Sequence, residues 1–206
     1  MLRSRRRESP TFFPSERARE SMYEVEVKVR ADHDAVRERL DATEAERVNC
    51  VAQTDTYYDA PHRDFAETDE ALRLRRESRY GGGELADEET VVTYKGPLVD
   101  ESSKTRREYE TGVEDGETMD AICEAVGFEP AATVEKERER FALDGYTVSL
   151  DSVSGLGEFV EVEVEVESGV DDAREGAFAV LRELGLDPDD QIRTSYLGML
   201  LGAPEE

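Results

Sequence analysis

Charged side chains alternate with apolar ones in two segments at opposite ends of the sequence. In the segment 23–30, Glu24, Glu26, Lys28 and Arg30 alternate with apolar residues. The segment near the end has acids at its alternate positions, which are Glu161, Glu163, Glu165 and Glu167. A period of two is typical of a β-strand whose two faces meet different surroundings. Each segment is therefore predicted to present a row of charged side chains on one face, with two acids followed by two bases in the first segment and four acids in the second.

Other predicted strands carry bases with the same alternation. The basic positions are Arg73 and Arg75 in ALRLRR, Lys95 in TYKG, Arg106 in TRREYE, and Lys136, Arg138 and Arg140 in EKERER. A solvated polar face is ordinary for an antiparallel sheet and accounts for each strand taken alone. If the apolar faces pack outward against helices, however, the acidic and basic faces meet inside a barrel. Buried charges there must pair with each other or bind ions.

Facing rows of acids and bases favour metal and phosphate chemistry. Carboxylate oxygens suit hard cations such as Mg²⁺ or Mn²⁺. Converging Arg and Lys side chains suit a chain of phosphates, which supplies several negative charges at once. Together, metal and cations neutralise the charge that develops in phosphoryl or nucleotidyl transfer.

The elements that must position these residues are mostly strands. Eight strands are predicted, at 23–30, 48–59, 71–76, 90–95, 104–113, 133–143, 146–151 and 158–167. Four helices are predicted, at 32–42, 117–126, 172–184 and 193–200. Residues 80–83 and the acids after them read as a hairpin loop, and Gly96-Pro97 is expected to end the strand before it. The expected fold is α+β, an eight-stranded antiparallel β-barrel or strongly curved sheet with helices packed outside.

The order of these segments resembles that of the CYTH, or triphosphate tunnel, enzymes. Glu24-Val-Glu26-Val-Lys28 matches the ExExK signature of that family. The resemblance continues in order through QTDTYYD (53–59), ALRLR (71–75), TYKGP (93–97), TRREYE (105–110), EKER (135–138), SLDSVSGLGEFVEVE (149–163) and RTSYLGML (193–200). ExExK alone is weak in a Glu-rich chain, but eight blocks in family order across 22–202 are specific.

The resemblance implies an eight-stranded tunnel and a role for each matching residue. The acids that match metal-holding positions are Glu24, Glu26, Asp151, Glu161 and Glu163. The bases that match triphosphate-binding positions are Lys28, Arg73, Arg75, Lys95, Arg106, Lys136 and Arg138. The residues expected to serve catalysis most directly are Glu24, Glu26, Lys28 and Lys136.

Several charged residues keep two interpretations. Arg107 lies next to Arg106 and could be the matching base instead. Glu108 and Glu110 could be metal ligands, although ion pairs that brace the tunnel cations are the preferred interpretation. Arg140 is interpreted as balancing surface acids. The last acids of the final strand, Glu165 and Glu167, are expected to be solvated.

The wider segments QTDTYYDAP, TYKGP and GLGEFVEVE are similar to the class IV adenylate cyclase branch. This resemblance implies conversion of ATP to 3′,5′-cyclic AMP and pyrophosphate, with two ions of Mg²⁺ or Mn²⁺. The alternative is a phosphohydrolase of the same fold, acting on inorganic tripolyphosphate or thiamine triphosphate. A non-catalytic triphosphate sensor is the second alternative. The shared motifs do not separate these functions, and a homodimer is compatible with all of them.

The amino-acid composition bears on which partners the protein can bind and on the salt concentration to which it is adapted. The chain has 51 acidic and 26 basic residues and a net charge of −25, which disfavours binding to nucleic acid or anionic membranes. Only four bases are lysine, namely Lys28, Lys95, Lys104 and Lys136, and this acid-rich, Lys-poor composition resembles that of halophile proteins. A retained lysine is therefore expected where a compact ammonium is needed.

No segment directs the chain into or across a membrane by sequence pattern, so a cytoplasmic location is expected. Residues 1–21 are basic, unlike the remainder, and are interpreted as a disordered or non-native leader, with Met22 as the natural start. Residues 22–206 are expected to form a single CYTH domain. The two cysteines and two histidines lack the spacing of a disulfide framework or a zinc site.

Overall fold

The computed structural model describes residues 23–81, 84–100 and 105–202. The predicted leader at 1–21 and the rare lysine Lys104 lie outside these ranges. Within them, none of the helices is long and apolar enough to cross a membrane.

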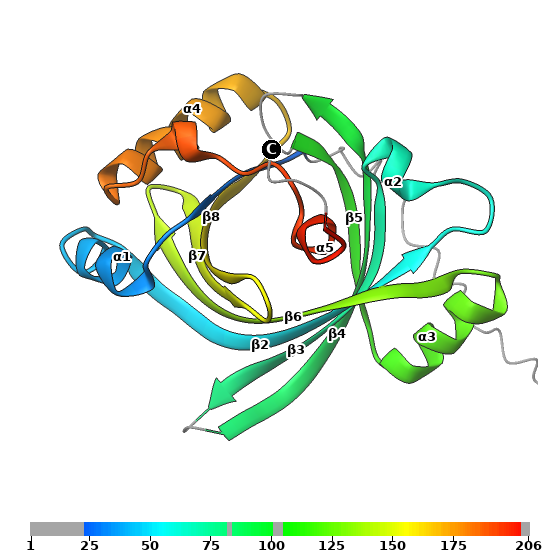
Figure 1. Cartoon of the computed structure of the whole chain (residues 1–206). Helices are drawn as coiled ribbons and strands as arrows, with labels where there is room; N and C mark the ends of the chain where they lie inside the picture. The colour runs from blue at the N-terminus through cyan, green and yellow to red at the C-terminus, as the bar shows by residue number, and fades with distance from the viewer. Residues whose placement is uncertain (1–22, 82–83, 101–104, 203–206) are drawn as a thin grey trace, which may run out of the picture.

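Eight antiparallel strands close into a barrel, as the alternation predicted (Figure 1). The strands are β1 (Tyr23–Arg30), β2 (Glu46–Asp59), β3 (Ala71–Gly81), β4 (Glu84–Asp100), β5 (Thr105–Val113), β6 (Glu129–Leu143), β7 (Tyr146–Val153) and β8 (Gly157–Val166). Their order around the barrel is β1-β5-β4-β3-β2-β6-β7-β8. The barrel closes where β8 pairs with β1, which brings the first and last acidic rows side by side.

The long β3–β4 hairpin differs from the prediction. Residues 84–89, expected in a loop, are part of β4, which pairs with β3 as far as Gly81. Gly96-Pro97 does not end β4 either, because the strand continues to Asp100. Instead, the register against β5 shifts between Lys95 and Leu98. Pro97 has no N–H for the ladder, and a local irregularity accommodates it without ending the strand.

The helices are α1 (His33–Leu40), α2 (Phe65–Thr68), α3 (Gly116–Ala125), α4 (Val170–Glu183) and α5 (Tyr196–Leu200), with a 3-10 turn η1 (Pro188–Asp190). Four of them lie within or close to predicted helices. The four-residue α2 was not predicted, because a single turn shows no periodicity. The last helix begins three residues later than expected, where Ser195 accepts a hydrogen bond from the Gly198 backbone N–H.

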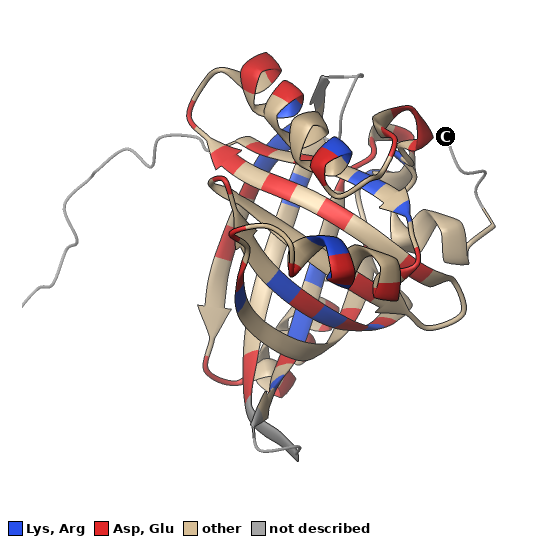
Figure 2. Cartoon of the chain, turned by 90° about the vertical axis from the view of Figure 1, so that its left-hand side faces the viewer, with Lys and Arg blue, Asp and Glu red and all other residues tan. Residues whose placement is uncertain are grey.

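The main hydrophobic core lies outside the barrel wall. Val27 and Val29 of β1 pack with Ala177 and Leu181 of α4. A smaller cluster places Leu74 of β3 beside α3. Because the apolar faces are used outside, the charged faces turn inward, as expected. Figure 2 shows the resulting bands of acidic and basic residues along the strands.

One end of the barrel interior is apolar rather than charged. Val134, Val153 and Phe159 share strand faces with inward-facing charged residues, and they pack with Tyr196 and Met199 of α5. Viewed along the barrel, α5 lies within the ring of strands (Figure 1). The last helix therefore covers one end of the barrel.

Candidate active site

The barrel encloses a cavity of ≈ 550 Å³, a size typical of small-molecule sites. It is lined by all of the predicted site residues except Asp151. The strand pleat explains this convergence, since alternate residues of neighbouring strands must face the same side.

Three acids of adjacent strands form a cluster at the cavity wall. Glu24 and Glu26 come from β1, and Glu163 of β8 pairs directly with Glu26. One carboxylate oxygen from each lies within 4.8 Å of the others. Burial raises the pKa of Glu24. Burial, opposed by Arg138 but helped by neighbouring carboxylates, raises the pKa of Glu163 to about 7. Oxygen donors that repel one another in this way fit a hard divalent cation.

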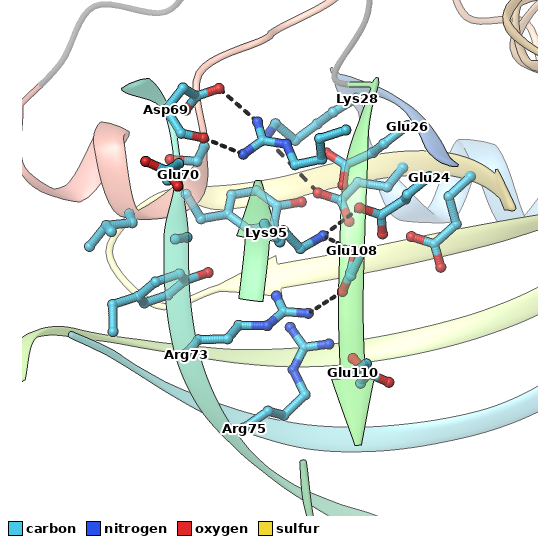
Figure 3. Close-up of a pocket in the computed structure, with 18 of the residues that line it drawn as sticks. Glu24, Glu26, Lys28, Asp69, Glu70, Arg73, Arg75, Lys95, Glu108 and Glu110 are labelled. Carbon is cyan, nitrogen blue, oxygen red and sulfur yellow. Dashed lines mark hydrogen bonds and ion pairs between the residues drawn. The ribbon is translucent and has the colours of Figure 1, made fainter. Parts of the chain in front are cut away.

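The opposite side of this cluster is held by a lysine. Lys95 of β4 donates to Glu24 and lies 2.9 Å from Glu108 of β5. Glu108 is also 3.9 Å from Arg73 of β3. Figure 3 shows these two basic side chains reaching toward Glu108. The contacts agree with the bracing interpretation of Glu108, whereas Glu110 accepts a hydrogen bond from Thr93.

Arg75 is fixed by an acid that the sequence interpretation missed. Its Nε and Nη2 atoms each donate to Asp55 of β2 at 2.6 Å. Arg73 lies 3.6 Å from the same carboxylate. Burial alone would raise the pKa of Asp55, but the two guanidinium groups outweigh it and hold this pKa below its usual range. The inward parity of Asp55 within QTDTYYD was the available signal.

Asp151 lies behind the basic residues of β6 and apart from the acidic cluster. It accepts two hydrogen bonds from Arg138, at 2.6 and 2.5 Å, and one from Lys136 at 3.1 Å. The Tyr196 hydroxyl donates a further one at 3.0 Å. These four donors match the acceptor capacity of a carboxylate. A direct metal-ligand role for Asp151 stays a prediction, and its contacts favour a counter-ion role.

Glu161 and Lys28 lie between this group and the acidic cluster. Glu161 accepts a hydrogen bond from Arg138, and its Oε1 is 4.0 Å from Lys28 Nζ. Both side chains are almost fully buried. Burial and the nearby Arg138 lower the pKa of Lys136 to about 8. Three basic side chains, those of Lys28, Lys136 and Arg138, therefore lie close together here.

Arg106, not Arg107, faces the cavity. Arg106 is 5% exposed and lines the cavity. It donates to the backbone carbonyl of Asp69 at 2.6 Å and to the Asp69 carboxylate at 2.7 Å. Asp69 follows α2 in the left-handed conformation, with φ 52°. No sequence signal identified Asp69, because α2 itself was not predicted.

Two other interpretations are tested by these positions. Arg140 does not balance surface acids, because it lines the cavity and pairs with Glu77 at 2.8 Å. Its inward parity with Arg138 explains the difference. Glu165 is exposed at the edge of the cavity and Glu167 is exposed beyond β8, as expected.

Comparisons with known proteins agree with this geometry. The CYTH domain profile matches residues 22–196. A candidate adenylate cyclase of Methanocaldococcus jannaschii is 38% identical over 179 residues, covering 85% of this chain and 97% of that protein.

Two solved structures show the same fold. A Pyrococcus horikoshii protein is 38% identical with a TM-score of 0.78, covering 86% of this chain and 98% of its own. A Hippeastrum adenylyl cyclase candidate, described as having a dominant triphosphatase activity, is 16% identical with a TM-score of 0.58, covering 80% and 88%. The profile match spans most of the chain, and the archaeal relatives match almost over their full length. The chain therefore belongs to the CYTH domain family.

Proposed function

We propose that this protein is a divalent-metal-dependent enzyme that binds the triphosphate of ATP in its tunnel and forms 3′,5′-cyclic AMP. The observation that carries the proposal is one cavity in which a three-carboxylate cluster lies next to converging bases. Acids hold a cation and bases hold phosphates, and both are needed when a phosphorus centre gains negative charge.

The residues divide into two groups by their chemistry. Glu24, Glu26 and Glu163 would hold Mg²⁺ or Mn²⁺, which polarises phosphate oxygens when bound. The bases that would bind and orient the triphosphate are Lys28, Arg73, Arg75, Lys95, Arg106, Lys136 and Arg138. Glu108 and Asp55 hold several of these bases in place, which lowers the entropic cost of binding.

In the proposed reaction, the ribose 3′-oxygen forms a bond to the α-phosphorus. The bridging bond between the α- and β-phosphates breaks, and pyrophosphate leaves with its electron pair. The hydroxyl proton passes to solvent or a basic side chain. Support for cyclisation comes from the 38% identical Methanocaldococcus relative, which is named as a candidate adenylate cyclase.

A second candidate function is hydrolysis of a triphosphate. Here water attacks the terminal phosphorus, and orthophosphate separates from the remaining diphosphate. The Hippeastrum protein, with its dominant triphosphatase activity, supports this alternative at the level of the fold. Both reactions use the same metal-binding acids and the same phosphate-binding bases. They differ in which phosphorus of the substrate faces a nucleophile.

One product analysis separates the alternatives. The protein is incubated with ATP, and separately with tripolyphosphate, with Mg²⁺ or Mn²⁺ at low and multimolar KCl. Cyclic AMP with pyrophosphate supports the cyclase. Orthophosphate from tripolyphosphate supports the phosphohydrolase and overturns cyclisation if ATP gives no cyclic AMP. Tight binding without any product would identify a triphosphate sensor instead.

A further inference from the structure

Tyr196 places an aromatic ring under two lysines that come from distant strands. Lys28 Nζ of β1 lies 4.4 Å from the ring centroid, and Lys136 Nζ of β6 lies 5.0 Å from it. Tyr196 is 7% exposed and lines the cavity. In the order of strands, β7 and β8 separate β6 from β1, so neither lysine is the strand neighbour of the other.

Contacts with two strands hold Tyr196 in place, and the segment that precedes it is bonded to a third. Phe159 packs edge-on against it at a centroid distance of 5.0 Å. Its hydroxyl donates to Asp151 at 3.0 Å. The segment before α5 is tied to β1, because the Ile192 backbone N–H donates to the Lys28 carbonyl at 2.7 Å.

We propose that Tyr196 is a positioning residue that sets the orientation and spacing of Lys28 and Lys136 at the covered end of the cavity. This inference rests on the proposed binding of a triphosphate. The two ammonium groups would then meet one end of the phosphate chain together, whichever reaction follows.

The position of Lys28 shows why a ring is needed. Its side chain is 2% exposed, yet its Nζ is 4.0 Å from Glu161, longer than a hydrogen bond. A buried ammonium gains a favourable interaction from an aromatic face. Without the ring, Lys28 would turn toward Glu161, and Lys136, which already donates to Asp151 at 3.1 Å, would lose the aromatic face that limits its position. The ring therefore holds Lys28 away from Glu161 and keeps both lysines in the wall of the cavity.

A purely structural role is the competing explanation, since Tyr196 also belongs to an apolar cluster with Met199. Three variants separate the two. Tyr196→Phe keeps the ring and removes the hydroxyl. Tyr196→Leu fills the space without a ring. If the leucine variant does not fold, Tyr196→Met takes its place in the comparison. Met199→Ala is the matched control, because it weakens the same cluster and leaves the ring.

Metal-free binding of tripolyphosphate is measured by calorimetry for each variant. We expect Tyr196→Phe to bind within about twofold of the wild type and Tyr196→Leu to bind about tenfold more weakly. Met199→Ala should lower the unfolding temperature while leaving the affinity unchanged. Wild-type affinity in Tyr196→Leu, or a loss in Met199→Ala as large as in Tyr196→Leu, would overturn the inference. A wild-type protein that does not bind tripolyphosphate would instead overturn the proposed function.

The four lysines allow a direct check of the geometry. In protein labelled with ¹³C-lysine, the ring current should shift the ε-methylene protons of Lys28 and Lys136 upfield. Lys28→Arg and Lys136→Arg each remove one lysine signal and thereby assign it. The shift should persist in Tyr196→Phe and vanish in Tyr196→Leu. Unshifted lysine signals in the wild type would contradict the positioning role even without a ligand.

Discussion

Arg106 and Asp69 form a two-point contact in the wall of the cavity. The guanidinium donates to both the backbone carbonyl and the carboxylate of Asp69. The carbonyl can hold Arg106 in place, but the carboxylate also neutralises it and competes with any incoming phosphate. Asp69 thus orients the Arg106 guanidinium and also offsets its positive charge.

Replacing Asp69 by Asn should therefore strengthen triphosphate binding. Asn accepts the left-handed conformation and keeps the carbonyl contact, so only the competing charge is lost. We expect tripolyphosphate to bind about threefold more tightly at low salt, because the Asp69 side chain is partly exposed and solvent screens the pair. Calorimetry at two salt concentrations measures this change.

Asp69→Ala is the matched control. It removes the same charge but places alanine at φ 52°. Alanine has no polar side chain to favour this left-handed conformation, which costs about 1 kcal/mol of stability. Binding should resemble that of Asp69→Asn, whereas unfolding should occur at a lower denaturant concentration. Weaker binding in both variants would show that the carboxylate is needed to hold Arg106.

The metal-free protein should lose stability as the acidic cluster ionises. The pKa of Glu163 is raised from 4.5 to about 7, so its carboxylate form destabilises the folded state. Stability is retained below pH 4.5 and falls as the pH rises toward 7, by an amount on the order of 1–3 kcal/mol. Added Mg²⁺ should restore it. Denaturant unfolding from pH 4.5 to 8, with and without Mg²⁺, measures this effect.

Glu163→Gln supplies the control for this pH dependence. The neutral amide removes the repulsion, so metal-free stability should vary little with pH and respond less to Mg²⁺. Turnover should fall by about 100-fold or more if Glu163 holds the metal. Full metal-dependent activity in this variant would exclude Glu163 from the site, and activity in both Glu24→Ala and Glu26→Ala would exclude the cluster.

Strand parity made much of this site predictable from sequence. A pleated strand forces alternate residues to one side, so the inward position of Glu24, Glu163 and Lys136 followed from spacing alone. The same rule would have identified Asp55. Which strands become neighbours does not follow from local pattern, so the pairing of Glu26 with Glu163 required the barrel closure.

The unpredicted parts of the site depend on short or irregular structure. Asp69 follows a helix of four residues, which was not predicted because a single turn shows no hydrophobic period. The last helix was predicted at 193–200, but its packing against the barrel interior, which brings Tyr196 to the cavity, does not follow from local pattern. The continuation of β4 through Pro97 is fixed by its pairing with β5, which local propensity does not encode.

Triphosphate binding should weaken as the pH rises above 8. Burial and Arg138 lower the pKa of Lys136 to about 8, so its ammonium is present below that pH and is lost above it. A bound phosphate favours the charged form, and binding near pH 8 to 9 should therefore take up a proton. Calorimetry in buffers of different ionisation enthalpy measures that uptake.

Lys136→Arg isolates the lysine from the titration of the phosphate itself. Arginine stays charged throughout this range, so its affinity should change with pH only as the ligand ionises. The difference in pH slope between the two proteins reports Lys136. Equal slopes would show that Lys136 keeps its proton to higher pH.

Breaking the buried pair of Asp55 and Arg75 should destabilise the barrel. Asp55→Asn removes the charge that balances Arg75 and leaves Arg73 with only its longer contact to Glu108, at a cost of about 3–5 kcal/mol. Tripolyphosphate should stabilise this variant more than the wild type, because the ligand supplies the missing negative charge. Thermal unfolding with and without ligand tests both effects. Glu77→Gln, which affects the less buried Arg140 pair, should cost less.

Salt should stabilise the protein beyond the range in which simple screening operates. The net charge of −25 makes self-repulsion a large term at low salt. Screening is nearly complete by about 1 M, where the Debye length is about 3 Å. If the acidic composition is an adaptation to salt, the unfolding temperature should continue to rise between about 1 and 3 M KCl. A plateau reached below about 1 M would attribute the whole effect to screening and contradict salt adaptation.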